Sequence, residues 1–327
     1  MDRNDSGWLT ESVSHCRLCR AVAKMTAEIA ILNKYAVALA TDSAVTISTA
    51  IRQEKIFDSA DKLFELSFKN PIGIMIYNGM NFAEIPLQVL IHEFRMKCVE
   101  FGAVFEAAES FLLHLNEFAR NAPQQVRKRS IENTVRPIID LIFQRSKNKF
   151  IDQITRGKKA AEKANIESYQ QILTATIARF QKSIDSEPDA NFIGSGPIII
   201  DSATTGILFE IVSDIFPTAN SNQRAELLNI CSSRLKKFIP IDGFTGVVIA
   251  GFGSEEKFPT LISLQLDGFV NGRLKYIKKE EVDIDRTGPK ASVIPFAQKE
   301  MVDRFLFGLD EALEDQIAAF AKKRLKV

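Results

Sequence analysis

Apolar segments with the short period of β-strands stand at both ends of the chain and enclose a long helical middle. They cover residues 26–32, 36–40, 62–66 and 71–77 near one end, and 246–253, 260–266 and 272–278 near the other. Residues from about 81 to 240 are predicted to be mainly helical, because long stretches of them are rich in Ala, Gln, Lys and Glu and contain few helix breakers. Strands this far apart in sequence predict an α+β fold or a layered sandwich whose sheets are completed by distant segments.

Turn signals divide the strand segments. Asn33-Lys34 separates the first two strands and predicts a hairpin. Asn78-Gly79 and Asp267-Gly268 are strong turn pairs, because Asn, Asp and Gly adopt the backbone angles that tight turns need. Ser186–Pro197 is the clearest loop of the chain.

Helix signals fill the middle and the C-terminal end. Pro86 lies near the start of a helix whose apolar stripe we expect to be Ile85, Val89, His92 and Met96. Further helices are predicted near residues 100–120, 124–148, 150–184, 203–216, 221–237 and 299–326. The basic end of the last one suits the negative end of a helix dipole.

Composition narrows the class of protein. The chain has 327 residues and a net charge of +1, which argues against general nucleic-acid binding because phosphate affinity needs a positive surplus. No stretch approaches the roughly 18–20 apolar residues of a membrane span. The four cysteines do not suggest a secreted disulfide scaffold. We therefore expect a cytoplasmic protein without a membrane segment.

The first 25 residues mix charged and polar types and read as an irregular extension, removed from the working protein or translated from an upstream start. Cys16-x-x-Cys19 within them is half of a zinc or redox motif, and no second pair has ligand spacing. We expect no metal and no cofactor. The working domain is predicted to span 26–327, with a helical elaboration over about 106–240.

Histidine is scarce, since only His15, His92 and His114 occur. Most Ser and Cys hydrolases need a histidine as base, whereas a threonine at a free N-terminus can use its own α-amine. Thr26 follows Met25, so removal of an initiator methionine would expose it. Asp42 follows sixteen residues later.

At this point the chain resembles the proteasome β-type subunits, including the HslV-like peptidases, which are N-terminal nucleophile hydrolases. The resemblance covers roughly residues 26–105 and 241–327 and omits the helical middle. The matching motifs, in family order, are Thr26, Asp42-Ser43, Lys62-Leu-Phe-Glu-Leu, Gly79, Val248-Ile-Ala-Gly-Phe-Gly, Phe258-Pro-Thr-Leu-Ile-Ser-Leu and Asp267-Gly268.

The resemblance implies a four-layer αββα sandwich with an extended helical insertion, and a threonine-type hydrolase that cleaves peptide amides. Thr26 would be the nucleophile, Asp42 would hold Lys62, and the Gly79 N–H would stabilise the oxyanion. A lysine ammonium would lower the pKa of both the Thr hydroxyl and the α-amine. Each of these residues also has a purely structural interpretation: Thr26 as a strand residue, Asp42 as a turn residue and Lys62 as a solvated lysine. Lys55 is the alternative candidate for the role of Lys62.

One family feature is missing. Active members carry a Gly-Ser-Gly-Ser-like turn with an Asp and a Ser before their last helix, and the corresponding stretch here is 294–300. Gln298 and Asp303 are the nearest polar candidates, and neither matches clearly. Two other functions therefore stay open: an inert proteasome-like structural subunit, and a small-amide hydrolase. The implied partners are a peptide or protein substrate, further copies in a homo-oligomeric ring and an ATP-dependent unfoldase, with no nucleic acid and no membrane.

Overall fold

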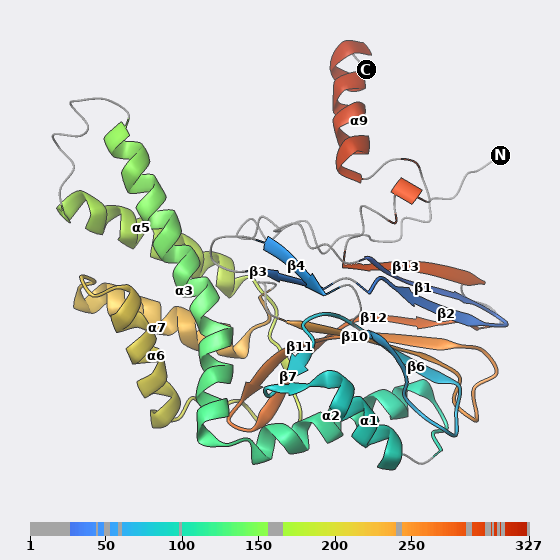
Figure 1. The fold of residues 1–327 in the computed structure, drawn as a ribbon. Coiled ribbons are helices and arrows are strands. Elements are labelled where there is room, and N and C mark those ends of the chain that lie inside the picture. The colour runs from blue at the N-terminus through green and yellow to red at the C-terminus, as the bar shows by residue number, and fades with distance from the viewer. Residues whose placement is uncertain are drawn as a thin grey trace.

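The computed structural model shows a mixed α+β protein with antiparallel sheets (Figure 1). Its helices and strands gather into a layered body, a helical lobe and a separate C-terminal helix. The residues that it describes are 27–43, 45–48, 53–57, 61–97, 100–155, 166–239, 244–285, 290–297, 302, 304–305, 308 and 311–325.

The smaller main sheet has three strands in the order β13-β1-β2. These are β1 (Ala27–Asn33), β2 (Val37–Thr41) and β13 (Ala291–Ala297). The predicted hairpin at Asn33-Lys34 is confirmed, since Asn33 Oδ1 accepts the N–H groups of Tyr35 at 2.8 Å and Ala36 at 3.0 Å. The first strand thus pairs with the last one of the chain.

The larger sheet has six strands in the order β5-β6-β10-β11-β12-β9. β6 pairs antiparallel with β10 from Ile72↔Gly251 to Asn78↔Thr245, so distant parts of the chain complete one sheet, as the sequence predicts. Its strands are β5 (Leu63–Glu65), β6 (Ile72–Asn78), β10 (Thr245–Gly251), β11 (Thr260–Val270), β12 (Arg273–Asp283) and β9 (Asn191–Phe192). Two short pairs are β3 (Val45–Ser48) with β4 (Gln53–Phe57), and β7 (Asn81–Phe82) with β8 (Ile85–Pro86).

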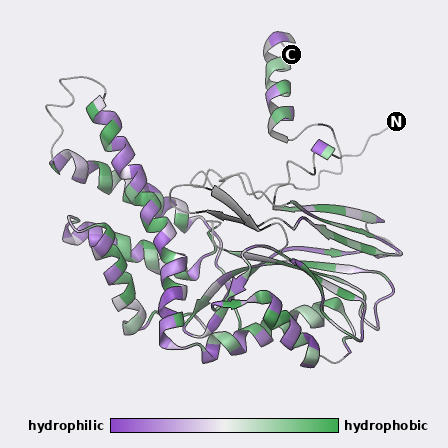
Figure 2. Cartoon of the chain, in the orientation of Figure 1, coloured by the Kyte–Doolittle hydropathy of each residue, from purple (hydrophilic) through white to green (hydrophobic). Residues whose placement is uncertain are grey.

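Three layers stack in the body. Buried residues from both sheets, among them Ala30, Leu32, Met75 and Val248, form a core between them. Helices α1 (Leu87–Lys97) and α2 (Val104–Asn121) cover the other face of the six-stranded sheet with a second core. Figure 2 shows hydrophobic residues along these stacked elements.

The outer face of the three-stranded sheet is open in the described part of the chain. Ile31 and Val293 on this face are 42% and 43% exposed. Helix α9 (Glu311–Leu325) projects away from the sheet (Figure 1). The fourth layer of the predicted αββα sandwich is therefore not confirmed.

The helical lobe has a hydrophobic core of its own. It contains α3 (Gln124–Thr155), α5 (Ile166–Asp185), α6 (Ser202–Ile215) and α7 (Ser221–Lys236), which bury Ile142, Phe180, Leu208 and Ile230, among others, against one another. A reciprocal cap starts α7, because Asn220 and Gln223 each accept the other's backbone N–H. The helix predicted over 150–184 is split between α3 and α5, and residues 156–165 lie outside the described part.

Two predicted details are wrong. The buried face of α1 consists of Leu87, Leu90, Ile91 and Phe94. The predicted stripe is displaced from it, since Val89 is 44% and Met96 65% exposed and His92 is exposed too. The reason is that the side of α1 with Leu87, Leu90, Ile91 and Phe94 packs into the core shared with the six-stranded sheet and α2.

The turn predicted at Asp267-Gly268 is also wrong. β11 continues through both residues to Val270, with an irregular register between Leu266 and Phe269. The chain turns at Asn271 and Gly272, whose φ values are 50° and 73°. The stretch from Ile294 to Ala297, which corresponds in sequence to the family's Asp and Ser region before the last helix, belongs to β13.

Within the described residues, no helix has both the length and the apolar composition that crossing a membrane requires.

Candidate functional site

Asp42 holds the start of β1 through both its backbone and its side chain. Its N–H donates to Ala27 O at 3.1 Å, and its Oδ2 accepts the Ala27 N–H at 3.2 Å. Asp42 follows β2 directly, so the hairpin formed with β1 brings it back beside the residue where β1 begins. The carboxylate thereby fixes the backbone one residue after Thr26.

The second oxygen of that carboxylate binds Lys62. Lys62 Nζ donates to Asp42 Oδ1 at 2.7 Å, and the lysine is only 3% exposed. Its backbone is tied to the six-stranded sheet, because Lys62 O accepts the Ile76 N–H at 2.8 Å. The pairing of Asp42 with Lys62 joins the two sheets at one end. Lys55 lies on β4, in a different sheet.

A third charged group, Glu28, lies in this cluster and was not identified from the sequence. Its Oε1 lies 3.5 Å from Lys62 Nζ, and the residue is fully buried. Burial, reinforced by the charge of Asp42 and opposed by Lys62, raises the pKa of Glu28 to about 7. A signal was available, because Glu28 shares the inward side of β1 with Ala30 and Leu32.

Gly79 lies where β6 ends. The preceding residue, Asn78, has a φ of 68°, which turns the chain out of the strand. The Gly79 N–H donates to Phe244 O at 3.2 Å, so this amide is engaged in a backbone hydrogen bond. A Cβ on Gly79 would overlap Thr245 Oγ1 and would lie 3.2 Å from Phe244 O. Glycine is required here by close packing.

The structure thus brings Asp42 and Lys62 together and places Gly79 at the end of β6, which is the strand next to β5. Thr26, the predicted nucleophile, lies outside the described residues. Its neighbour Ala27 is the residue that Asp42 binds.

A hollow of about 510 Å³ adjoins the Gly79 turn. Asn81 and Thr245 line it on the side of that turn, and Asn133 and Asp140 of α3 line it on the side of the lobe. Burial raises the pKa of Asp140, although Arg136 opposes the shift. The helical lobe therefore contributes one wall of a cavity beside the predicted oxyanion position.

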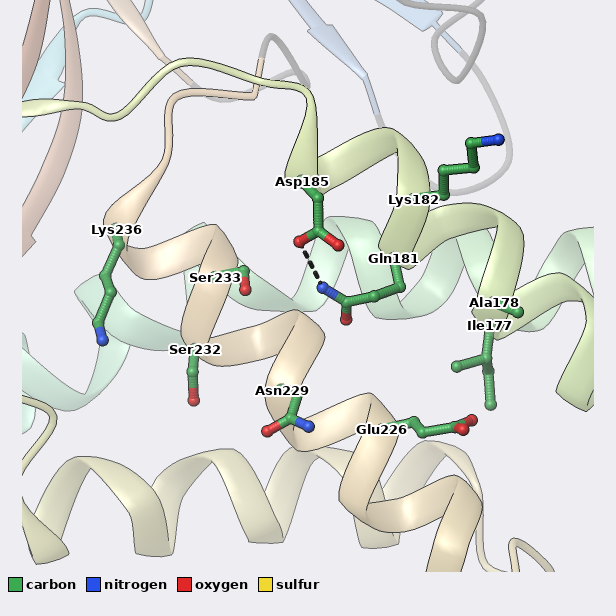
Figure 3. Close-up of a pocket in the computed structure, with 10 residues that line it drawn as sticks. All are labelled: Ile177, Ala178, Gln181, Lys182, Asp185, Glu226, Asn229, Ser232, Ser233 and Lys236. Carbon is green, nitrogen blue, oxygen red and sulfur yellow. Dashed lines mark hydrogen bonds between the residues drawn. The ribbon is translucent and has the colours of Figure 1, made fainter.

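A second hollow, of about 740 Å³, lies within the lobe between α5 and α7 (Figure 3). Gln181 and Asp185 of α5 border it, and they are hydrogen-bonded to each other at 2.8 Å. Its lining comes from α5 and α7 alone and shares no residue with the Asp42–Lys62 cluster. Side chains at this hollow include no histidine or cysteine.

Asp267, predicted to be in a turn, instead anchors the lobe to the six-stranded sheet. It accepts both guanidinium nitrogens of Arg234 on α7, one at 2.8 Å, and Lys275 Nζ on β12 at 2.7 Å. Burial opposes ionisation of this carboxyl, but the two cations outweigh that effect and lower the pKa of Asp267. The cluster of Asp267, Arg234 and Lys275 therefore has a structural role, which the turn signal at Asp267-Gly268 did not indicate.

The histidines of the described residues lie away from the charged cluster. His114 on α2 is 7% exposed, and its Nε2 lies 3.2 Å from Leu90 O. His92 is exposed, although it was expected on the apolar stripe of its helix, and its Nδ1 lies 3.4 Å from Arg95 Nη2. His15, Cys16 and Cys19 lie outside the described part of the chain.

The chain matches no protein-family model, no curated protein and no solved structure.

Proposed function

We propose that the protein is a proteasome-like threonine-type hydrolase that cleaves amide bonds with Thr26 as its N-terminal nucleophile. The observation that carries this proposal is the double use of the Asp42 carboxylate. One oxygen binds the Ala27 N–H at 3.2 Å, and the other binds Lys62 Nζ at 2.7 Å. A buried lysine is thus held beside the residue that follows Thr26.

The chemistry needs no histidine. The α-amine of a free Thr26 takes the proton from its own Oγ, and Oγ attacks the substrate carbonyl carbon. The C–N bond then breaks, the ammonium returns its proton to the leaving amine, and an ester to Thr26 remains. Water, deprotonated by the same amine, attacks this ester, the bond from the acyl carbon to Oγ breaks, and the ammonium returns the proton to Oγ as the carboxylic acid leaves. The Lys62 ammonium favours each negatively charged oxygen along this path.

The stacked antiparallel sheets and the position of Gly79 support the finer fold assignment, a four-layer sandwich of the N-terminal nucleophile type. In this proposal copies of the chain assemble into a homo-oligomeric ring. A peptide amide is the proposed substrate, and delivery of protein substrates by an ATP-dependent unfoldase follows from the resemblance alone.

The test compares Thr26→Ala with Thr26→Ser in the full chain. Purified proteins are assayed against fluorogenic peptide amides and N-acyl amino acids, and labelled with a peptide epoxyketone, which joins a hydroxyl and a free amine in one ring. We expect Thr26→Ala to lose hydrolysis and labelling and Thr26→Ser to keep both. Hydrolysis that is unchanged in Thr26→Ala would rule the proposal out.

One observation favours a second candidate, the inert structural subunit. The Gly79 N–H already donates to Phe244 O at 3.2 Å, so it must leave this partner before it can stabilise an oxyanion. An inert subunit would assemble normally and show neither hydrolysis nor labelling at Thr26.

The hollow beside Gly79 favours a third candidate, a small-amide hydrolase. Its volume of about 510 Å³ and its wall from α3 suit a compact substrate. Preference for N-acyl amino acids over peptides in the same assay would identify this activity.

A further inference from the structure

Glu28 is the buried charged group of the site that the proposed chemistry does not use. It sits two residues after Thr26, between the two sheets, with no exposed surface. Ionisable side chains are rarely buried this completely unless they are paired. Its environment therefore calls for a specific explanation.

The partners of Glu28 are few. Oε1 lies 3.5 Å from Lys62 Nζ and 3.5 Å from Thr41 Oγ1, which also donates to Asp42 O at 3.0 Å. The other oxygen, Oε2, is buried and has no hydrogen-bond partner among the described residues. A carboxylate buried without a donor for each oxygen costs more than a neutral carboxyl in the same place, because burial penalises the charged form most.

The charge balance of the cluster also favours a protonated Glu28. Lys62 supplies one positive charge, and Asp42 binds it more closely than Glu28 does, at 2.7 Å against 3.5 Å. A second negative charge at Glu28 would leave the cluster with a net charge of −1. With Glu28 protonated, the cluster is neutral.

Among the described residues, the charges that act on Glu28 are those of Lys62 and Asp42. The remaining titratable group near it is Tyr77 of β6, whose hydroxyl stays neutral because burial raises its pKa. Opposite Glu28 on β13 lies Phe296, which is apolar. The pKa of Glu28, raised to about 7 mainly by burial, agrees with this arrangement.

We propose that Glu28 is a positioning residue whose protonation sets the electrostatic effect of Lys62 on the nucleophile. The inference rests on the proposed function. The neutral acid leaves the Lys62 charge opposed by Asp42 alone, so the ammonium lowers the pKa of the Thr26 hydroxyl and amine. At higher pH the Glu28 carboxyl loses its proton to solvent, and the route passes Asp42, whose side chain is 34% exposed. The resulting carboxylate offsets the positive charge of Lys62. Activity therefore declines at alkaline pH as Glu28 ionises.

The experiment measures kcat/KM from pH 5.5 to 9 with a fluorogenic peptide amide. Glu28→Gln is compared with the unmutated chain, and Glu65→Gln, which removes a glutamate whose side chain is 57% exposed, is the control. In the unmutated chain and the control we expect kcat/KM to fall several-fold as the pH rises through about 7 and then to level off. In Glu28→Gln the decline should move up by at least one pH unit. An unchanged profile in Glu28→Gln overturns the proposal.

A second measurement separates this inference from the proposed function. A carboxyl whose pKa is higher in the folded state stabilises at low pH, and this contribution is lost as the pH rises through the folded-state value. The Tm of the unmutated chain minus that of Glu28→Gln should therefore fall between pH 5 and pH 8. Absence of hydrolysis at every pH would reject the proposed function, and a difference in Tm independent of pH would reject a titrating Glu28.

If Glu28→Gln does not fold, the unmutated Glu28 is observed directly. Glutamate carboxyls are labelled with ¹³C in a Glu187→Gln background, because burial also raises the pKa of Glu187. One resonance that titrates near pH 7 is the expected result. If no glutamate carboxyl titrates above about pH 6, the inference is overturned.

Discussion

Lys62 Nζ lies 2.7 Å from Asp42 Oδ1, and the other oxygen of the same carboxylate holds the Ala27 N–H at 3.2 Å. The two residues come from different sheets, since Asp42 follows β2 and Lys62 precedes β5. Their pairing joins the sheets at the end where β1 begins. It is the feature on which the proposed chemistry depends.

Replacing Lys62 by Met should lower kcat/KM by about 10²-fold or more, because the charge that favours the developing oxyanion is lost. It should also destabilise the fold by roughly 1–3 kcal/mol, since Glu28 and Asp42 lose their shared cation. Lys62→Arg keeps the charge and is the control. Activity in Lys62→Met within threefold of the unmutated value would exclude an electrostatic role for Lys62.

Gly79→Ala should lower stability by about 1–3 kcal/mol, because the new Cβ would overlap Thr245 Oγ1. Thr245→Ala removes that oxygen, so the double variant should regain part of the loss. Urea unfolding of the two single variants and the double variant gives the coupling energy. Strict additivity of the two changes would show that Thr245 does not restrict position 79.

Asp267→Asn should destabilise the protein by about 3–5 kcal/mol, because it leaves Arg234 and Lys275 buried without their anion. The control is Asp189→Asn, since Asp189 pairs with Lys237 but its side chain is 84% exposed. That change should cost less than about 1 kcal/mol. Equal losses in the two variants, measured by chemical unfolding, would contradict the structural role of Asp267.

The general order of elements could be predicted from sequence because strand runs and turn pairs are local signals. The hairpin at Asn33 and the pairing of β6 with β10 follow the apolar pattern and its position in the chain. Asp42 and Lys62 were found through a resemblance, and the structure brings them together.

Long-range contacts account for what the sequence did not predict. Asp267-Gly268 carries a turn signal, yet the Asp267 carboxylate binds Lys275 on the next strand and Arg234, which lies 33 residues away in sequence, and β11 continues through both residues. Glu28 shares one side of β1 with Ala30 and Leu32, which marks that side as the inward one, but its approach to Lys62 follows only from the stacking of the two sheets. Neither effect is visible in a local window of residues.

The stability of the fold should also decrease in mild acid through His114. Burial among α1 and α2 lowers the pKa of His114, whereas the unfolded chain keeps the ordinary value of about 6.5. As the pH falls, His114 is therefore protonated in the unfolded chain before it is protonated in the folded protein. This favours unfolding, so stability falls as the pH drops below about 6.5. Chemical unfolding at pH 5.5 and 7.5 should show a smaller change for His114→Gln than for the unmutated chain. The same change in both would assign the acid sensitivity to other groups.

The mature N-terminus tests the central claim most directly. Intact-mass measurement and N-terminal sequencing of the purified protein determine which residue carries the free α-amine. The account predicts a chain that begins at Thr26, with the hydroxyl and the amine on one residue. A functional protein in which Thr26 is internal, preceded by any other residue, would contradict it.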